Sequence, residues 1–553
     1  MNLKKKSFAH YVWIGLFVIT VFAVLNFAQD KKKNTLTSTI VLEIAQPTFE
    51  KIATADENLE KQLTYYLKIA AVVDEKNREK PFTLFGNQAK GKIARWLEAA
   101  SELERQDCYK KYLYELARNI RERGDFFVES PSWLSLEQDR LEIVFPQADR
   151  YSAAMQVLQT FFNISAGSYS WGKGNFFDAA VFFNNPDVTL KYKEYTDVFP
   201  LMQDHLYALP ALANSRQEIY YSPLIPSFKI AQLIFASQPE IRGGAFVYPD
   251  IDVFGQDAAD EKYKNEEENK FKIIVFRNIA ETYFEGVLKP ISASILTAEQ
   301  VRGLDPEIYL SNLIMRRIAH HLGPVFVIAS KGEDRVDRVD RVDKGGKMGQ
   351  KKEQKSTTAQ ELKTVSELLG NLFPVLEAVK SQAVAIYNTP VLVNSGLLPD
   401  DKAVNVYLTY LVTLIDQLRN TPNEMNATQQ PGKKNWEELL GDAGKENYLA
   451  ALIQFNYLLA EECIILNIGS RTLDINREKF STAVGALTGE VIRMMTYPHY
   501  DTTRWFIEKN SVLSPHLREI LKSVEDIPFQ VKFHLEKPAL IKEDVNTDTD
   551  TKD

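Results

Sequence analysis

Two arginines and two histidines lie close together in the stretch from Asp305 to Pro324. Arg316 and His320 are four residues apart, so a helix would present both on one face, and His321 follows directly. Two histidines at that spacing, with a glutamate after the first, form a zinc-binding helix whose glutamate acts as base on a zinc-bound water. Here Arg316 stands at the first histidine position and Arg317 at the glutamate position. The stretch therefore keeps the spacing of a zinc helix but lacks its chemistry.

The same stretch carries the signals of one helix. Asp305 is a suitable N-cap, Pro306 fits the first helical position, and Gly323-Pro324 would end the helix. Apolar residues recur at helical spacing, at Leu310, Leu313, Ile314 and Ile318.

The arginines decide what this helix can hold. A guanidinium stays protonated, has no lone pair for zinc and takes no proton from water. A catalytic zinc needs about three protein ligands, and one histidine beside two fixed positive charges would repel a dication. We therefore expect no metal cofactor. Arg316 and Arg317 are better suited to hold a carboxylate through bidentate hydrogen bonds, and a salt bridge to Glu377 or to another helix is the simpler alternative.

The composition excludes several classes of protein. The chain has 553 residues, of which 45% are hydrophobic and 25% charged, as in an ordinary globular protein. Its net charge of -8 and the lack of a basic stripe argue against a nucleic-acid partner. The two cysteines, Cys108 and Cys463, are too few for a disulfide framework, and we expect both to be buried thiols.

The N-terminus predicts contact with a membrane. Lys4-Lys5-Lys6 precede a run from Tyr11 to Ala28 that is apolar apart from Thr20 and Asn26. Such a run is a signal peptide or an uncleaved anchor, and a poor cleavage site favours the anchor. We expect the rest of the chain to be exported to the periplasmic side of a bacterial membrane, anchored or secreted.

The rest of the chain predicts an α+β protein with two lobes. The pattern is helical from Ala55 to about Arg123, and a strand is expected at Thr39–Ile44. From Lys270 onward it is mostly helical. The expected division is a signal segment or anchor (1–30), a tether (31–55), a mixed α+β lobe (56–265), a mostly helical lobe (266–535) with a mobile charged insertion (332–356), and a disordered acidic tail (536–553).

A second stretch, Gln360 to Asn388, is predicted to be helical and broken near Pro374. Together with the first it resembles the dipeptidyl peptidase III family of zinc metallopeptidases, most of all its shorter bacterial relatives. Those proteins carry a His-Glu-x-x-His-x-Leu-Gly-Pro helix and a Glu-Glu-x-Lys-Ala-Asp helix. The matching segments are Arg316–Pro324, Glu377–Gln382, Asn388–Leu398 and Ile453–Leu459. The resemblance covers roughly residues 265 to 535.

The resemblance implies a metal site that is mostly lost. His320 matches the second histidine ligand, and Arg316 stands at the first. Arg317 stands at the catalytic glutamate and Ala378 at the ligating glutamate. Glu377 and Lys380 fit the family pattern, whereas Gln382 replaces its aspartate. In the longer family members the histidines are five apart, which would make His321 the matching residue.

The resemblance also implies a fold, with a mostly helical lobe facing a mixed lobe across a cleft. Glu461-Glu462-Cys463 looks like the start of the longer members' third-ligand motif, but Ile464-Ile465 follows. We interpret it as a helix end with Cys463 in the core.

The leading hypothesis is a catalytically inactive protein of this kind in the bacterial envelope, which binds peptides or other carboxylate-bearing ligands in its cleft. The candidate cleft residues are Arg316, Arg317, His320, His321, Glu377 and Lys380. One alternative is an active metal-dependent peptidase or hydrolase whose metal site is rebuilt from His320, His321, Glu377 or carboxylates of the other lobe. Another is an envelope scaffold protein whose cleft has no role.

Overall fold

In the computed structural model of the chain, the structure describes residues 39–43, 57–79, 87–123, 141–144, 180–184, 186–212, 219–221, 225–236, 270–329, 361–419, 445–467, 469–527 and 530–534. The predicted membrane segment, the charged insertion and the acidic tail lie outside these residues. Among the helices that the structure describes, none has the length and apolarity needed to cross a bilayer.

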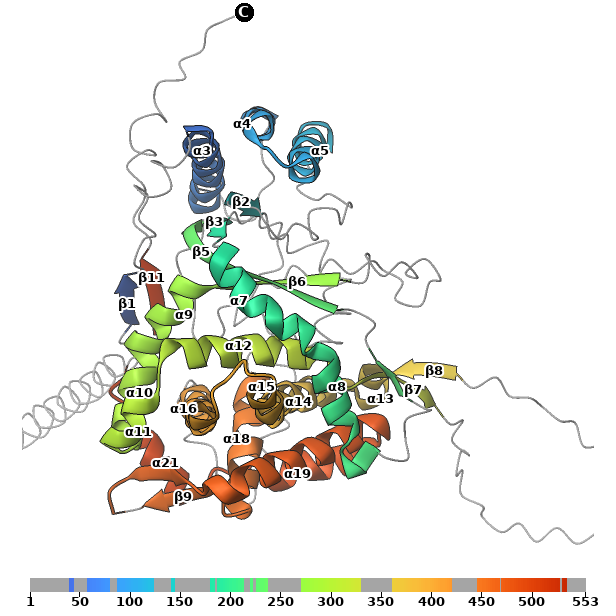
Figure 1. Ribbon diagram of the computed structural model, residues 1–553, viewed down its shortest axis with the longest axis vertical. Coiled ribbons are helices and arrows are strands. Elements are labelled where there is room, and N and C mark those ends of the chain that lie inside the picture. The colour runs from blue at the N-terminus through green and yellow to red at the C-terminus, as the bar shows by residue number, and fades with distance from the viewer. Residues whose placement is uncertain are drawn as a thin grey trace, which may run out of the picture.

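Three helices form the N-terminal part of the described chain, as the sequence predicts. They are α3 (Glu57–Glu79), α4 (Asn87–Leu103) and α5 (Asp107–Arg123), at the top of Figure 1. Each buries one stripe, such as Tyr109, Leu113 and Leu116 of α5. The prediction that Cys108 is buried is wrong, because Cys108 stands at the edge of that stripe in the first turn of α5 and is exposed.

A four-stranded sheet with the order β2-β3-β5-β6 lies below these helices (Figure 1). Its strands are β2 (Leu141–Val144), β3 (Ala180–Asn184), β5 (Ile225–Ala236) and β6 (Lys270–Phe276). All neighbours are antiparallel except β5 and β6, which are parallel. The prediction of mostly helical structure from Lys270 onward is confirmed for the described residues, with β6 as an exception. The β-branched residues Ile273, Ile274 and Val275 favour a strand there.

Three smaller sheets complete the strands. β4 (Ile219–Tyr221), β7 (Pro324–Ala329) and β8 (Glu361–Thr364) form an antiparallel sheet in the order β4-β7-β8. β9 (Ile464–Asn467) and β10 (Thr472–Ile475) form a hairpin. The predicted strand near Thr39 is confirmed as β1 (Thr39–Glu43), which pairs in parallel with β11 (Gln530–His534). The division into lobes at residue 265 stays a prediction, and β5 and β6 pair across it.

The remaining helices form a body around α12 (Pro306–His320), as Figure 1 shows. Before it in the chain come α7 (Pro186–Asp197), α8 (Phe199–Tyr207), the 3-10 turn η2 (Pro210–Leu212), α9 (Arg277–Tyr283), the π-helical η4 (Phe284–Leu288), α10 (Lys289–Ile295) and α11 (Ala298–Gly303). After it come α13 (Val365–Leu369), the 3-10 turn η5 (Gly370–Leu372), α14 (Phe373–Tyr387), α15 (Thr389–Asn394), the 3-10 turn η6 (Asp400–Lys402), α16 (Ala403–Arg419), α18 (Lys445–Ala460), α19 (Arg477–Thr496), α20 (Tyr500–Asn510) and α21 (Pro515–Lys522). The predicted break near Pro374 is confirmed by η5, which separates α13 from α14. The prediction that this helix starts at Gln360 is wrong, because Glu361–Thr364 pair with β7 as strand β8 and the helix begins at Val365.

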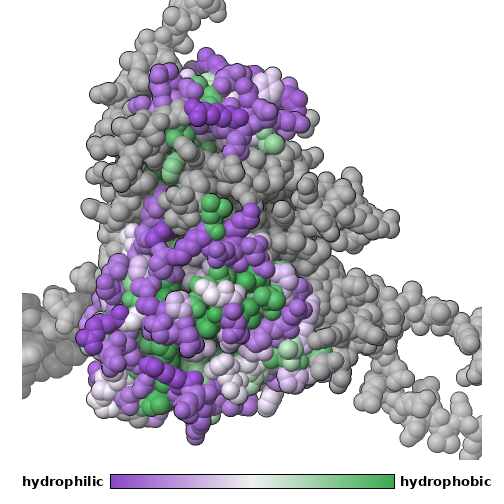
Figure 2. Space-filling model, in the orientation of Figure 1, coloured by the Kyte–Doolittle hydropathy of each residue, from purple (hydrophilic) through white to green (hydrophobic). Residues whose placement is uncertain are grey.

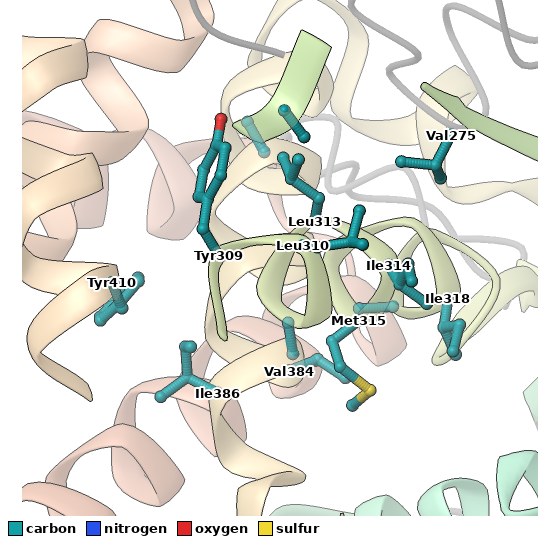
Figure 3. Packing of buried hydrophobic residues seen from close by; sticks show 14 of the residues in the cluster. Val275, Tyr309, Leu310, Leu313, Ile314, Met315, Ile318, Val384, Ile386 and Tyr410 are labelled. Atoms are coloured by element: carbon teal, nitrogen blue, oxygen red, sulfur yellow. The ribbon is translucent and has the colours of Figure 1, made fainter. Parts of the chain in front are cut away.

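The core is built around α12. Figure 3 shows Leu310, Ile314 and Ile318 along this helix, with Val384 and Ile386 of α14 nearby. On the face of the molecule in Figure 2, the described surface is mostly hydrophilic, and apolar side chains gather in patches over the helical body. Cys463 is buried just after α18, as predicted.

Candidate functional site: a buried cluster between α12 and α14

Local sequence fixes both ends of α12. The carboxylate of Asp305 accepts a hydrogen bond from the backbone N–H of Ile308 at 2.9 Å, which caps the helix, and Pro306 follows. The helix ends at His320, and Gly323 adopts a positive φ of 94° that lets β7 begin at Pro324. These signals place Arg316, Arg317 and His320 on the last turns of the helix.

Glu377 of α14 joins the two helices. Its Oε1 accepts a hydrogen bond from Lys380 Nζ at 2.8 Å and contacts His320 Nδ1 at 3.1 Å. Lys380 Nζ also donates to the backbone carbonyl of His320 at 3.0 Å. The side chains of all three residues are 5% exposed or less. We call these three residues the buried cluster.

Burial sets the charge of this cluster. It lowers the pKa of His320 well below 6.5, and the positive charges of Arg317 and Lys380 lower it further. His320 is therefore neutral at pH 7, and its Nδ1–H donates to Glu377. Burial raises the pKa of Glu377 to about 7, although the Lys380 ammonium acts in the opposite direction. The pKa of His321, which is also buried, is lowered for the same reasons as that of His320.

The two arginines have different surroundings. Arg316 is half-buried and donates from NH2 to Asn447 Oδ1 of α18 at 2.7 Å. Arg317 is buried. The simpler expectation was a salt bridge from the arginines to Glu377 or to another helix. Lys380 and His320 are the groups that bind Glu377, and Arg316 bonds instead to Asn447 of another helix, α18.

A network of amides continues from the cluster at Gln382, the position where the resemblance implies an aspartate. Gln454 of α18 donates to Gln382 Oε1 at 2.8 Å and accepts from the Tyr410 hydroxyl at 2.6 Å. Gln382 Nε2 donates to Gln417 Oε1 at 3.3 Å. Sequence reasoning missed this network, although Gln454 lies in one of the segments that carry the resemblance. Its neutral groups leave no carboxylate at this position.

The donors around the cluster do not fit a catalytic zinc. Ala378 has no donor, the arginines bring fixed positive charge, and Nδ1 of His320 is bonded to Glu377. The Lys380 ammonium already lies at hydrogen-bond distance from the only nearby carboxylate of the cluster. In the part of the chain that the structure describes, no group of three or more His, Cys, Asp or Glu could hold a metal ion.

The structure thus brings the candidate residues together, but mostly inside the core. His320, His321, Glu377, Lys380 and Arg317 are buried, and among the six candidate residues only Arg316 is partly exposed. In this conformation Arg316 is therefore the candidate residue that a ligand in solution can contact.

Comparison with known proteins supports the fold. No family model matches the chain. A curated relative, Nudix hydrolase 3 of Arabidopsis thaliana, is 21% identical over 437 residues, which are 77% of this chain and 47% of that protein. The chain thus spans about half the length of the curated relative it matches.

Two solved structures are similar over most of the chain. Dipeptidyl peptidase III from Caldithrix abyssi superposes with a TM-score of 0.60 and 18% identity, covering 82% of this chain and 72% of that one. Dipeptidyl-peptidase III from Corallococcus sp. strain EGB superposes with a TM-score of 0.55 and 16% identity, covering 82% of this chain and 70% of that one. The chain therefore has a dipeptidyl peptidase III-like fold, mostly helical with small sheets.

Proposed function

We propose that this chain is a non-catalytic protein with a dipeptidyl peptidase III-like fold that binds a peptide end or another carboxylate-bearing ligand near Arg316. The observation that supports this most is the pairing of Glu377 with Lys380 and His320. A hydrolase would need this carboxylate and this imidazole as a base or as metal ligands, and here they are bonded to each other and to Lys380.

Peptide hydrolysis needs a group that takes a proton from the attacking water. Arg317 stands where the family places its glutamate, and a guanidinium cannot act as a base. Glu377 is the carboxylate of the buried cluster, but it is buried and bonded to two donors. His320 is neutral, yet burial keeps it from solvent. Among the six candidate residues, none is both exposed and able to act as a base.

Binding is better supported at Arg316. Arg316 is a partly exposed residue, and its guanidinium bonds to the amide of Asn447, which is also a partly exposed residue. Guanidinium and amide groups both suit a carboxylate, which accepts several hydrogen bonds in one plane. A peptide terminus or an acidic side chain would supply such a group.

The catalytic part of the proposal is tested on the purified chain without chelator or histidine tag. We expect no bound zinc after incubation with excess metal, and no dipeptide release from fluorogenic peptides. The matched variant is Arg316→His/Arg317→Glu/Ala378→Glu, which restores the ligand types and should gain zinc. Stoichiometric zinc in the unmodified chain, with activity that a chelator abolishes, would instead favour a hydrolase with a rebuilt site.

The binding part is tested with a peptide library and its C-terminally amidated counterpart. Arg316→Ala should weaken binding of a selected peptide by about tenfold or more, as expected for a charge-assisted hydrogen bond. Arg302→Ala, at an exposed arginine of α11, is the matched control. Equal binding by both variants would favour the scaffold alternative.

We also propose that the protein is exported and membrane-attached, on the evidence of the apolar run from Tyr11 to Ala28. Membrane fractionation with carbonate extraction tests this: an uncleaved anchor stays in the membrane pellet, and a cleaved signal leaves a shorter, extractable protein.

A further inference from the structure

Helix α8 lies against the turn that follows α12. A Cβ built on Gly323 would lie 3.0 Å from Ile492 Cδ1 of α19, 3.5 Å from Lys380 Cδ and 4.0 Å from Leu206 Cδ2, so all three side chains pack around the same glycine. Leu206 is fully buried, as are Met202 and Phe199 on the same face of α8. In Figure 1, α8 runs down toward α19. α8 packs against α15, and η2, which follows α8, packs on α19. Leu206 of α8 and Ile492 of α19 therefore cover the turn beside Lys380 together, and α8 forms one side of this cover.

The C-terminal end of α8 is held to α14 by a small polar contact. The ring of His205 stacks on that of Tyr387, with centroids 4.2 Å apart and planes 4° from parallel. His205 Nδ1 lies 3.2 Å from Asn388 Oδ1. The amide nitrogen of Asn388 donates to the carbonyl of Val384, so its oxygen faces His205, which donates from Nδ1–H. We call these residues the α8 contact.

The preceding helix, α7, is held to α12 by polar groups too. Glu307 of α12 accepts hydrogen bonds from the Tyr192 hydroxyl at 2.6 Å and from Lys191 Nζ at 3.2 Å. One turn further along each helix, the hydroxyls of Tyr195 and Ser311 are hydrogen bonded. α7 also packs against β5 of the four-stranded sheet. This second attachment keeps α7 in place when α8 moves.

From these contacts we propose that α8 is a lid over the buried cluster, which opens by local displacement of residues 199–207 while α7 and the helical body stay folded. The helix is short, and three of its own apolar side chains form its buried face. Its last turn is held by the α8 contact. Segments with so few attachments open at a lower free energy than the whole protein unfolds. Opening gives solvent and ligands access to Lys380 and Glu377. This holds whether or not the protein is a hydrolase, so it does not rest on the proposed function.

The test follows the labelling of lysines by acetic anhydride in the folded full-length chain, with mass spectrometry. Lys191, whose side chain is 65% exposed, is the internal reference for reagent reactivity. Lys380, whose side chain is 2% exposed, should label slowly but faster than global unfolding permits. Global unfolding is measured by amide hydrogen exchange of α16 and α18.

Two pairs of variants locate the effect. His205→Ala removes the α8 contact and should raise the labelling rate of Lys380 by about fivefold, the effect of losing one partly buried hydrogen bond. His499→Ala is the control, because His499 lies at the start of a different helix, α20. It should leave the labelling rate of Lys380 unchanged. Leu206→Ala should raise it, whereas Leu201→Ala should not, because Leu201 lies on the same helix but is 54% exposed.

Amide exchange of residues 199–207 should accelerate together with Lys380 labelling, while exchange in α16 and α18 stays as slow as before. The lid would be refuted if Lys380 became labelled only as fast as the slowest amides of α16 and α18 exchange, in the unmodified chain and in every variant. In that case only global unfolding exposes the cluster.

Discussion

At the scale of single residues, the buried cluster is an ion pair that an uncharged histidine completes. Glu377 and Lys380 are three residues apart on α14, and each also bonds to His320 at the end of α12. A buried charge without its partner is costly, so the cluster depends on both members being present. The neutral state of His320 allows it to donate to Glu377 without adding a third charge.

Replacement of the cation should therefore destabilise the protein strongly. Lys380→Met keeps most of the side-chain volume but removes the ammonium, and we expect the free energy of unfolding to fall by about 3 kcal/mol. The measurement is urea denaturation followed by circular dichroism. Lys402→Met removes a half-exposed partner of Asp305 and should cost less than about 1 kcal/mol. Equal losses in the two variants would contradict a structural role for the cluster.

The pH dependence of stability follows from the same residues. The pKa values of His320 and His321 are lowered, so below pH 6.5 the unfolded chain binds protons that the folded chain does not, and stability falls as the pH falls. Glu377 has a pKa of about 7 in the folded state, above its usual 4.5, so between these values the folded chain holds the extra proton and stability rises as the pH falls. Because two histidines oppose one carboxyl, their combined contribution to the unfolding free energy is larger, and the net stability falls as the pH falls.

Glu377→Gln removes the carboxyl whose proton uptake stabilises the folded chain as the pH falls. Between pH 6.5 and 5, the unfolding free energy of the variant should fall more steeply than that of the unmodified chain, by about 1.4 kcal/mol per pH unit. Chemical denaturation at pH 5, 6 and 7 measures both slopes. Parallel slopes would mean that Glu377 is ionised in the folded protein throughout this range.

Much of this site could be predicted from sequence, and its burial could not. The spacing of Arg316 and His320 and the resemblance around Glu377 bring the right residues together. The bond from Lys380 to the backbone of His320 depends on how α12 and α14 pack, and no local pattern encodes that. The cover by Leu206 comes from a helix more than a hundred residues earlier in the chain, so the expectation of an open cleft had nothing in the sequence to correct it.

At the scale of elements, α12 is the best predicted because its signals are local. Asp305, Pro306 and Gly323 act on their own backbone neighbours, and all three have the predicted roles. β6 was missed because its neighbour in the sheet, β5, begins 45 residues earlier in the sequence, at Ile225. A short apolar run such as Ile273–Phe276 is compatible with a helix until such a partner is known.

The cap of α12 offers a test at this scale. Asp305→Ala removes the acceptor for the N–H of Ile308 and should lower the unfolding free energy by about 1 kcal/mol. Asp305→Asn keeps a capping oxygen and should lose little, because the exposed contact with Lys402 contributes weakly. Thermal or urea unfolding distinguishes the two. If both variants lose the same stability, the carboxylate charge matters and the cap does not.

At the scale of the whole molecule, the two ends of the described chain meet in one sheet. β1 and β11 pair in parallel, with Ile40 opposite Val531 and Leu42 opposite Phe533. Part of the segment expected to be a tether is therefore bound to the body. If the segment that ends at Ala28 anchors the protein, the ten residues 29–38 separate it from β1, and they span at most about 35 Å. An anchored body would then stay close to the membrane.

The pairing of the two ends predicts how truncation acts. A chain that starts at residue 46 lacks β1 and leaves the backbone groups of β11 without this partner, whereas a chain that starts at residue 35 keeps it. The shorter chain should melt a few degrees lower, and trypsin should cleave it faster after Lys532, the partner of Val41 in β1. A synthetic peptide of residues 36–46 should slow that cleavage again, because an added strand can restore the backbone hydrogen bonds. Equal cleavage of the two chains would show that β1 contributes nothing to holding β11, and protection only in the longer chain would mean that β1 must be covalently attached to pair.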